Sequence, residues 1–177
     1  IFRTDTGAAA TIGTSLGALG VTMNGQLTWD VAGNTLTANT TTTNLGLTLG
    51  PVTLAGPSTF VTTGDGVRNT YMYIGAVQEV GGPQSLIKAG GGSLRFNGTN
   101  TNEGPTIIKK GDIYLTATAN LSPNSAVVIS PEAGKTARLN LSTNGPHLES
   151  IASLSSEGEG TAAVTLGSSS LTVGRNG

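Results

Sequence analysis

Apolar and polar residues alternate along most of this chain, in short runs of about three to six residues. A period of two places successive side chains on opposite faces of a β-strand. The pattern therefore predicts many short strands, each with one apolar side facing inward. The inward positions that it predicts are Leu27, Trp29 and Val31; Leu45, Leu47 and Leu49; Leu94 and Phe96; Ile113, Leu115 and Ala117; Val127 and Ile129; Ala137, Leu139 and Leu141; Ala162, Val164 and Leu166; and Leu171 and Val173.

Residues typical of turns, namely Gly, Asn, Ser, Asp and Pro, separate nearly all of these runs. The best helical candidate is segment 146–160, where Leu148, Ile151 and Leu154 recur at every third position. This segment is rich in Ser and ends in Gly, so we expect at most a turn or two of helix there. The sequence predicts an all-β protein with no substantial helix.

The spacing of the strands favours a solenoid over a sandwich. Residues 23–26 and 143–146 contain the Asn-Gly pair of a tight hairpin, but most spacers are longer or lack it. Short strands joined by corners can instead stack along one axis. A coil of three short strands needs about 20–25 residues, so we expect roughly seven to nine coils. Composition does not change sharply, so residues 1–177 should form a single β-solenoid domain.

The composition agrees with this architecture and excludes several classes of protein. Only 4% of residues are aromatic and 11% charged, against about 25% charged in typical domains. A net charge of -1 gives no broad field for nucleic acid or an anionic membrane. The absence of Cys excludes disulfides and Cys-based metal sites. No apolar run approaches the ~18 residues of a membrane span, so we expect no membrane insertion by this segment.

Residues 86–115 read LIKAGGGSLRFNGTNTNEGPTIIKKGDIYL. This segment resembles the autotransporter-associated β-strand repeat of bacterial surface and exported proteins. Asn102 stands where that family usually has Tyr, and Pro105 stands where a second Gly is common. A weaker likeness extends over residues 45–177. The matching positions are Lys88, Gly90, Gly92, Leu94, Phe96, Gly98, Asn100, Thr101, Gly104, Thr106, Ile108, Gly111 and Ile113.

The resemblance implies a right-handed parallel β-helix of the passenger type, exported and displayed on the bacterial cell surface. It implies no chemistry. The chain starts at Ile1 and shows no signal peptide, so we expect a processed product, a proteolytic core or an excised fragment.

The Gly-rich stretch at residues 90–93 could be a phosphate loop, a linker or a corner. A phosphate loop needs the spacing G-x-G-x-x-G or a Gly followed by Lys-Ser, with a helix following. This stretch lacks the last Gly of that spacing, the Lys-Ser pair and the helix. We expect a corner between strands, where Gly permits a positive φ.

Few residues are candidates for catalysis. His147 is the only His, with Glu149 two residues on and Ser abundant. A catalytic triad would need these groups to meet; a surface His on a Pro-bearing turn is the favoured interpretation. Asp112 follows Lys109 and Lys110, which indicates solvated charges on one corner. The other carboxylates are scattered, whereas glycoside cleavage needs a close pair.

Candidate binding residues are also sparse. Glu157 and Glu159 form the densest acidic spot but lack the spacing of a calcium loop, so we expect an exposed turn. Residues 39–44 could form an outward Thr/Asn ladder. Tyr71 and Tyr73 should form an outward pair that could be a contact surface, with Met72 and Ile74 inward. Glycosylation signals occur at Asn39, Asn97 and Asn140.

These observations favour a non-catalytic extracellular structural protein, the β-solenoid shaft of a bacterial surface filament or autotransporter-like passenger. We see no polar cap at residues 1–20 or 170–177. The partners expected are therefore other copies, end to end, or neighbouring coils of a longer chain. The alternative is an adhesin or glycan-binding module; a polysaccharide-degrading β-helix enzyme is less favoured. We predict no catalytic, cofactor-binding or metal-binding residues and no cofactor.

Overall fold

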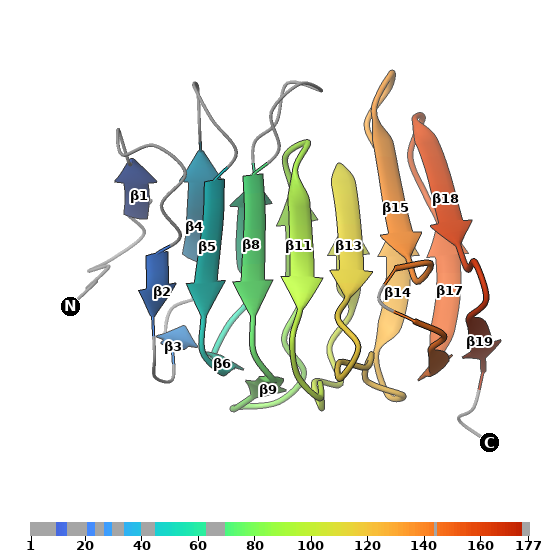
Figure 1. The fold of residues 1–177 in the computed structure, drawn as a ribbon, viewed down its shortest axis with the longest axis horizontal. Coiled ribbons are helices and arrows are strands. Elements are labelled where there is room, and N and C mark those ends of the chain that lie inside the picture. Colours follow the sequence, from blue (N-terminus) through green and yellow to red (C-terminus); the bar gives the residue numbers. More distant parts are fainter. Residues whose placement is uncertain are drawn as a thin grey trace.

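The protein is an all-β parallel β-solenoid (Figure 1). The computed structural model describes residues 10–13, 21–23, 27–29, 34–39, 45–62, 70–143 and 145–174, with side chains from residue 48 onward. All strand pairs within these ranges are parallel, and the ranges contain no helix. No helix long and apolar enough to cross a membrane is therefore found there.

Three sides are formed by successive strands that pair with strands of the next turn of the chain. The first sheet has the order β1 (Ala10–Gly13), β4 (Asn34–Asn39), β7 (Ser58–Thr62), β10 (Leu86–Ala89), β12 (Thr106–Ile108), β14 (Ala126–Ile129) and β17 (Ser153–Ser156). The second sheet has the order β2 (Val21–Met23), β5 (Leu45–Leu49), β8 (Thr70–Ile74), β11 (Ser93–Phe96), β13 (Gly111–Leu115), β15 (Thr136–Asn140) and β18 (Thr161–Thr165).

The third side is less regular than the two sheets. It contains β3 (Leu27–Trp29), β6 (Val52–Leu54) and β9 (Val77–Glu79) at one end, and β16 (Leu148–Ile151) with β19 (Ser170–Val173) at the other. Between them the strands are reduced to a single bridge from Thr99 to Asn120.

The side chain of Asn100 takes over part of the missing ladder on the third side. Its Oδ1 accepts a hydrogen bond from the Val77 amide at 2.9 Å, and its Nδ2 donates to the Asn120 carbonyl at 2.9 Å. The buried side-chain amide of Asn100 thus links Val77 in the preceding turn to Asn120 in the following turn, as the backbone of a strand residue would. This satisfies backbone groups that would otherwise be left unpaired away from water.

Apolar residues fill the interior in the predicted alternation. In β8, Met72 and Ile74 are fully buried while Tyr71 and Tyr73 point outward, as expected. The inward positions confirmed as buried are Leu49, Leu94, Phe96, Ile113, Leu115, Val127, Ile129, Ala137, Leu139 and Leu141. The sets at Leu27, Trp29 and Val31 and at Leu45 and Leu47 lie outside the residues whose side chains are described.

Two predictions about strand ends were wrong. Ala117 is exposed rather than inward, because β13 ends at Leu115. Leu166 likewise lies past the end of β18 and is 38% exposed. Segment 146–160 contains the strands β16 and β17 and no helix; the period of three at Leu148, Ile151 and Leu154 does not reflect helical structure.

The Gly-rich stretch forms a corner, as predicted. It joins β10 to β11, and Gly90 has a φ of +75°. A Cβ atom on Gly90 would lie 2.3 Å from the Thr62 carbonyl oxygen of the preceding turn. The amide of Gly92 donates a hydrogen bond to that same oxygen at 2.8 Å. Positive φ and this close approach both require glycine at position 90.

Candidate functional site

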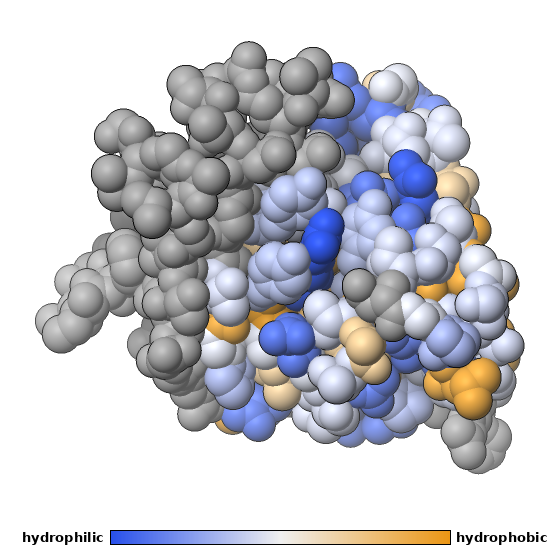
Figure 2. Space-filling view, in the orientation of Figure 1, coloured by the Kyte–Doolittle hydropathy of each residue, from blue (hydrophilic) through white to orange (hydrophobic). Residues whose placement is uncertain are grey.

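The outward side of the second sheet carries an unusual cluster, which we call the tyrosine–arginine face. It consists of Tyr71 and Tyr73 from β8, Arg95 from β11, Asp112 and Tyr114 from β13, and Arg138 from β15. The chain has only three tyrosines, and all of them belong to this face. The second sheet faces the viewer in Figure 1, and in Figure 2 its surface is mostly pale to blue.

Arg95 lies at the centre of the face because the parallel register places tyrosines on both sides of it. Arg95 is paired with Tyr73 on β8 and with Tyr114 on β13. Its guanidinium carbon is 4.3 Å from the ring centre of Tyr71, 5.4 Å from that of Tyr73 and 5.2 Å from that of Tyr114. All three distances fall within the range of a cation–π contact. Its Nη1 also donates a hydrogen bond to the Tyr73 hydroxyl at 3.0 Å.

An ion pair extends the face to the next strand. The Nε of Arg138 is 2.9 Å from Oδ1 of Asp112, and the Tyr114 hydroxyl donates to Oδ2 of Asp112 at 3.4 Å. Burial, followed by the neighbouring Asp112 carboxylate, raises the pKa of Tyr114, so its hydroxyl remains a donor at neutral pH. We expected Asp112 to be one of several solvated charges at a corner; its side chain is 19% exposed and pairs with Arg138 across the strands.

A polar groove of about 320 Å³ adjoins the face at Asp112 and Arg138. Lys110 and Lys135 bring two further cations to its wall, so three cations surround one carboxylate there. The residues lining the groove are Gly91, Lys110, Gly111, Asp112, Gly134, Lys135, Thr136 and Arg138.

Lys88 is buried at the corner between β10 and β11, with no exposed surface. Its Nζ donates hydrogen bonds to the carbonyl oxygens of Ala89, Gly90 and Lys110, at 2.7, 2.6 and 2.9 Å. Burial lowers the pKa of Lys88 to about 7, although Asp112 opposes this shift. The side chain thus ties two successive turns of the solenoid together, and it contacts no other side chain by a hydrogen bond in the described part of the chain.

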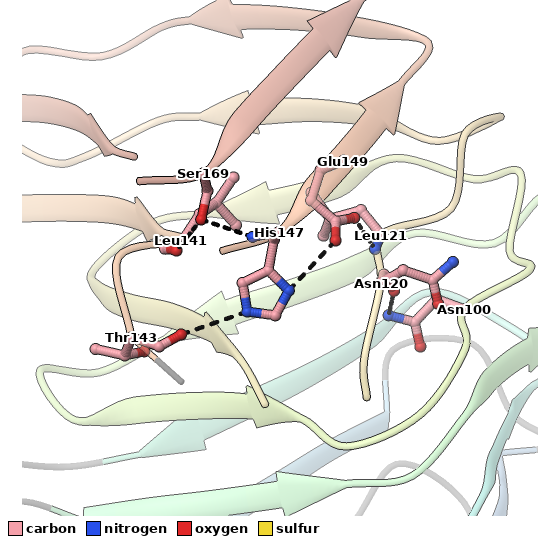
Figure 3. A network of polar contacts seen from close by, with 8 residues as sticks. All are labelled: Asn100, Asn120, Leu121, Leu141, Thr143, His147, Glu149 and Ser169. Atoms are coloured by element: carbon pink, nitrogen blue, oxygen red, sulfur yellow. Dashed lines mark hydrogen bonds and ion pairs between the residues drawn. The ribbon is translucent and has the colours of Figure 1, made fainter. Parts of the chain in front are cut away.

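His147 and Glu149 are both buried, which overturns the expectation of a surface histidine (Figure 3). Their side chains are 4% and 3% exposed, and Nδ1 of His147 is 3.6 Å from Oε1 of Glu149. The Leu121 amide donates to Oε2 of Glu149 at 2.8 Å. Burial raises the pKa of Glu149, and this amide and His147 both act against that shift.

The network around His147 does not have the geometry of a catalytic triad. Its Nε2 lies 3.3 Å from the Thr143 carbonyl. Ser169 contacts the backbone instead: its hydroxyl accepts from the His147 amide at 2.9 Å and donates to the Leu141 carbonyl at 2.6 Å. Within the described residues no serine hydroxyl is hydrogen-bonded to the imidazole, so the serine is not placed for activation by this His. The network holds β16 and the loop before β19 together.

The remaining sequence candidates are unremarkable in the structure. Glu157 and Glu159 are exposed, as predicted for a turn. No group of three or more His, Asp or Glu in the described ranges is placed to share a metal ion. Most of the predicted ladder at residues 39–44 lies outside the described residues, as do residues 1–9, 14–20 and 175–177 at the ends of the chain.

The interior of the solenoid opens to solvent at the strands β17, β18 and β19, which we call the terminal rung. Leu154 on β17 is paired with Val127 and is 37% exposed, whereas Val127 is 1% exposed. Val173 on β19 is 47% exposed, while its partner Ile151 is fully buried. The same inward positions are thus covered in one turn and uncovered in the next. Orange patches at the right-hand edge of Figure 2 lie over this end of the molecule.

Comparison with known proteins identifies no relative. No protein-family model matches the chain, and neither a curated protein nor a solved structure matches it.

Sequence reasoning missed the roles of Lys88 and Glu149. Lys88 stands two residues after Leu86 in an alternating strand, so both side chains point to the same side. This period of two was a signal that Lys88 is buried. Glu149 likewise stands two residues before the buried Ile151 in β16. Its partner could not be foreseen, because the Leu121 amide is 28 residues away along the chain.

Proposed function

We propose that this chain is a non-catalytic extracellular structural protein, the β-solenoid shaft of a bacterial surface filament or autotransporter-like passenger. The placement at the cell surface rests on the resemblance of residues 86–115 to the autotransporter-associated repeat. The proposal includes a right-handed winding. It also includes the expected count of roughly seven to nine coils.

The observation that carries the proposal is the terminal rung. Its inward apolar positions are uncovered, and the outer edges of β17, β18 and β19 have no strand paired to them within the described residues. These strands read SLSS, TAAVT and SLTV, without a charged residue or proline. Natural edge strands that stay unpaired are normally protected by such residues. This rung is therefore suited to pairing with a further coil.

That further coil belongs either to a longer chain or to the next copy. All strands run parallel, so the two ends of the solenoid present opposite edges, and one copy can continue the ladders of another. Such a head-to-tail contact does not close and would build a filament. In the filament, backbone ladders would run along the axis and the aliphatic core would continue from copy to copy.

A substitution at the terminal rung tests head-to-tail assembly. Leu154→Lys places a charge at an uncovered inward position and should abolish rods seen by electron microscopy at neutral pH without ligand. Leu148→Lys is the matched control, because Leu148 is 87% exposed and points outward from β16. Rods from the wild type and from Leu148→Lys, but not from Leu154→Lys, are expected.

Two results would contradict the proposal in different ways. Strictly monomeric behaviour of the wild type in sizing and scattering experiments would exclude head-to-tail assembly. Polysaccharide cleavage that persists through repurification would exclude a non-catalytic role.

The tyrosine–arginine face favours the second candidate, a glycan-binding module. A structural shaft needs only a hydrophilic exterior. The clustered tyrosines and arginines of this face go beyond that requirement.

A further inference from the structure

The tyrosine–arginine face differs in chemistry from the side of the solenoid formed by the first sheet. There the outward positions at matching rungs are Ile87, Ile107 and Val128, which the register stacks directly above one another. On the second sheet the outward positions carry aromatic rings and charges. A purely structural exterior gives no reason for gathering every tyrosine of the chain on one side, so this face is a candidate for recognition.

The charges on the face and its groove favour an anion. Arg95, Arg138, Lys110 and Lys135 stand against one carboxylate, Asp112, in a chain whose net charge is -1. The Arg95 guanidinium has five N–H donors, and it donates a single hydrogen bond to the described residues, to Tyr73. The face therefore has donor capacity for carboxylate or sulfate groups of a ligand.

The backbone of the face cannot recruit a peptide as an added strand. The strands β8, β11, β13 and β15 are each paired on both sides, so no free edge is offered there. Stacking of a nucleobase is also hindered, because Arg95 already lies against the rings of all three tyrosines. Recognition has to use hydroxyl and guanidinium groups on a flat surface, which suits the many hydroxyls of a polysaccharide.

We propose that the tyrosine–arginine face and its adjoining groove bind an acidic polysaccharide. Arg95 and Arg138 hold its carboxylate or sulfate groups, Lys110 adds charge at the groove, and the tyrosine hydroxyls bond to sugar hydroxyls. The chain would run across the strands, from rung to rung along the solenoid. This goes beyond the proposed role as a shaft, which uses the terminal rung and not this face.

Native gel electrophoresis in gels that contain a polysaccharide tests the proposal. Alginate supplies carboxylates, dextran sulfate supplies sulfates, and neutral dextran is the control for the latter. We expect alginate or dextran sulfate, but not dextran, to retard the wild type. The acidic polysaccharide that retards it more shows whether carboxylate or sulfate is the preferred anionic group. Arg95→Gln should weaken this binding about tenfold or more, the loss typical of one charge-assisted hydrogen bond.

Lys109→Gln is the matched control for the loss of one positive charge. Lys109 is exposed and lines a different groove with Glu132 and Glu159, where two carboxylates face one cation. This variant should bind within about twofold of the wild type. Tyr73→Phe removes one hydroxyl and keeps the ring, so it should fold even if Arg95→Gln does not, and should weaken binding about threefold, less than a charge-assisted bond.

Several outcomes would overturn the proposal. These are no retardation by either acidic polysaccharide, equal retardation by dextran, equal losses in Arg95→Gln and Lys109→Gln, or unchanged binding in both Arg95→Gln and Tyr73→Phe. Tighter binding to single-stranded oligothymidine would show a nucleic-acid site instead. Scattering on the same samples reports rod formation separately, so failure of this site leaves the shaft testable on its own.

Discussion

Lys88 shows how one residue can connect two turns of a solenoid. Its three hydrogen bonds go to the carbonyls of Ala89 and Gly90, where the Gly-rich corner begins, and to the carbonyl of Lys110 in the next turn. Three acceptors match the three N–H groups of an ammonium, while burial opposes the charge. The residue therefore couples the stability of the corner to pH.

The pH dependence of stability gives the first prediction. Burial lowers the pKa of folded Lys88 to about 7, from 10.5 in the unfolded chain. Between these values the unfolded chain binds more protons, so the folded state gains stability as pH rises, by up to about 1.4 kcal/mol per pH unit. Chemical denaturation of Lys88→Met should lack this rise. At pH 9 this variant should also be less stable than the wild type, by about 2 kcal/mol, because carbonyls lose their donor.

Lys109→Met is the control for that measurement. Lys109 is exposed, so its removal should leave the rise between pH 7 and pH 10 intact. An equal rise in Lys88→Met would contradict the assignment of the pH dependence to Lys88.

At the scale of single elements, the corners decide where the chain can turn. Gly81 and Gly90 have nearly the same φ, +76° and +75°. A Cβ on Gly81 would have no neighbour within 4 Å, whereas one on Gly90 would lie 2.3 Å from a backbone oxygen. The two glycines therefore separate the effect of conformation from the effect of close approach.

This pair gives the second prediction. Gly81→Ala should lower the free energy of unfolding by about 1 kcal/mol, the conformational penalty alone. Gly90→Ala should lower it by about 3 kcal/mol or more, since the ladder between β7 and β10 must also shift. Thermal unfolding followed by circular dichroism measures both. Equal losses in the two variants would show that the contact at Gly90 relaxes freely.

The elements were largely predictable from the sequence, and the polar networks were not. Alternation alone placed Leu94 and Phe96 inward, because a strand with one buried side needs a period of two. It could not place His147, because burial at a turn depends on what the next turn lays over it. Here Ser169, which lies 22 positions later, accepts the hydrogen bond of the His147 amide. Contacts between turns depend on which residues of successive turns are paired, and the alternation of apolar and polar residues does not determine that pairing.

At the scale of the whole molecule, the three sides and the end have different chemistry. The middle rungs of the first sheet are aliphatic on their outer side, at Ile87, Ile107 and Val128. The second sheet carries the tyrosine–arginine face. The terminal rung has uncovered apolar positions, and its outer edges have no partner among the described residues. A shaft that also binds polysaccharide would use the rung to extend and the face to adhere. Because the two surfaces do not share residues, Leu154→Lys and Arg95→Gln should affect assembly and binding independently.

The parallel ladders also determine how the molecule responds to force. Leu86 pairs with Thr106, 20 positions later, and the hydrogen bonds between them lie along the solenoid axis. A pull along that axis loads one turn at a time, and each detached turn releases about 70 Å of extended chain. Pulling single molecules from the end at β19 should give repeated steps of about this length. One all-or-none rupture would contradict this expectation. Such a shaft would lengthen stepwise under load. It would stay attached at both ends, because each detached turn dissipates part of the applied mechanical energy.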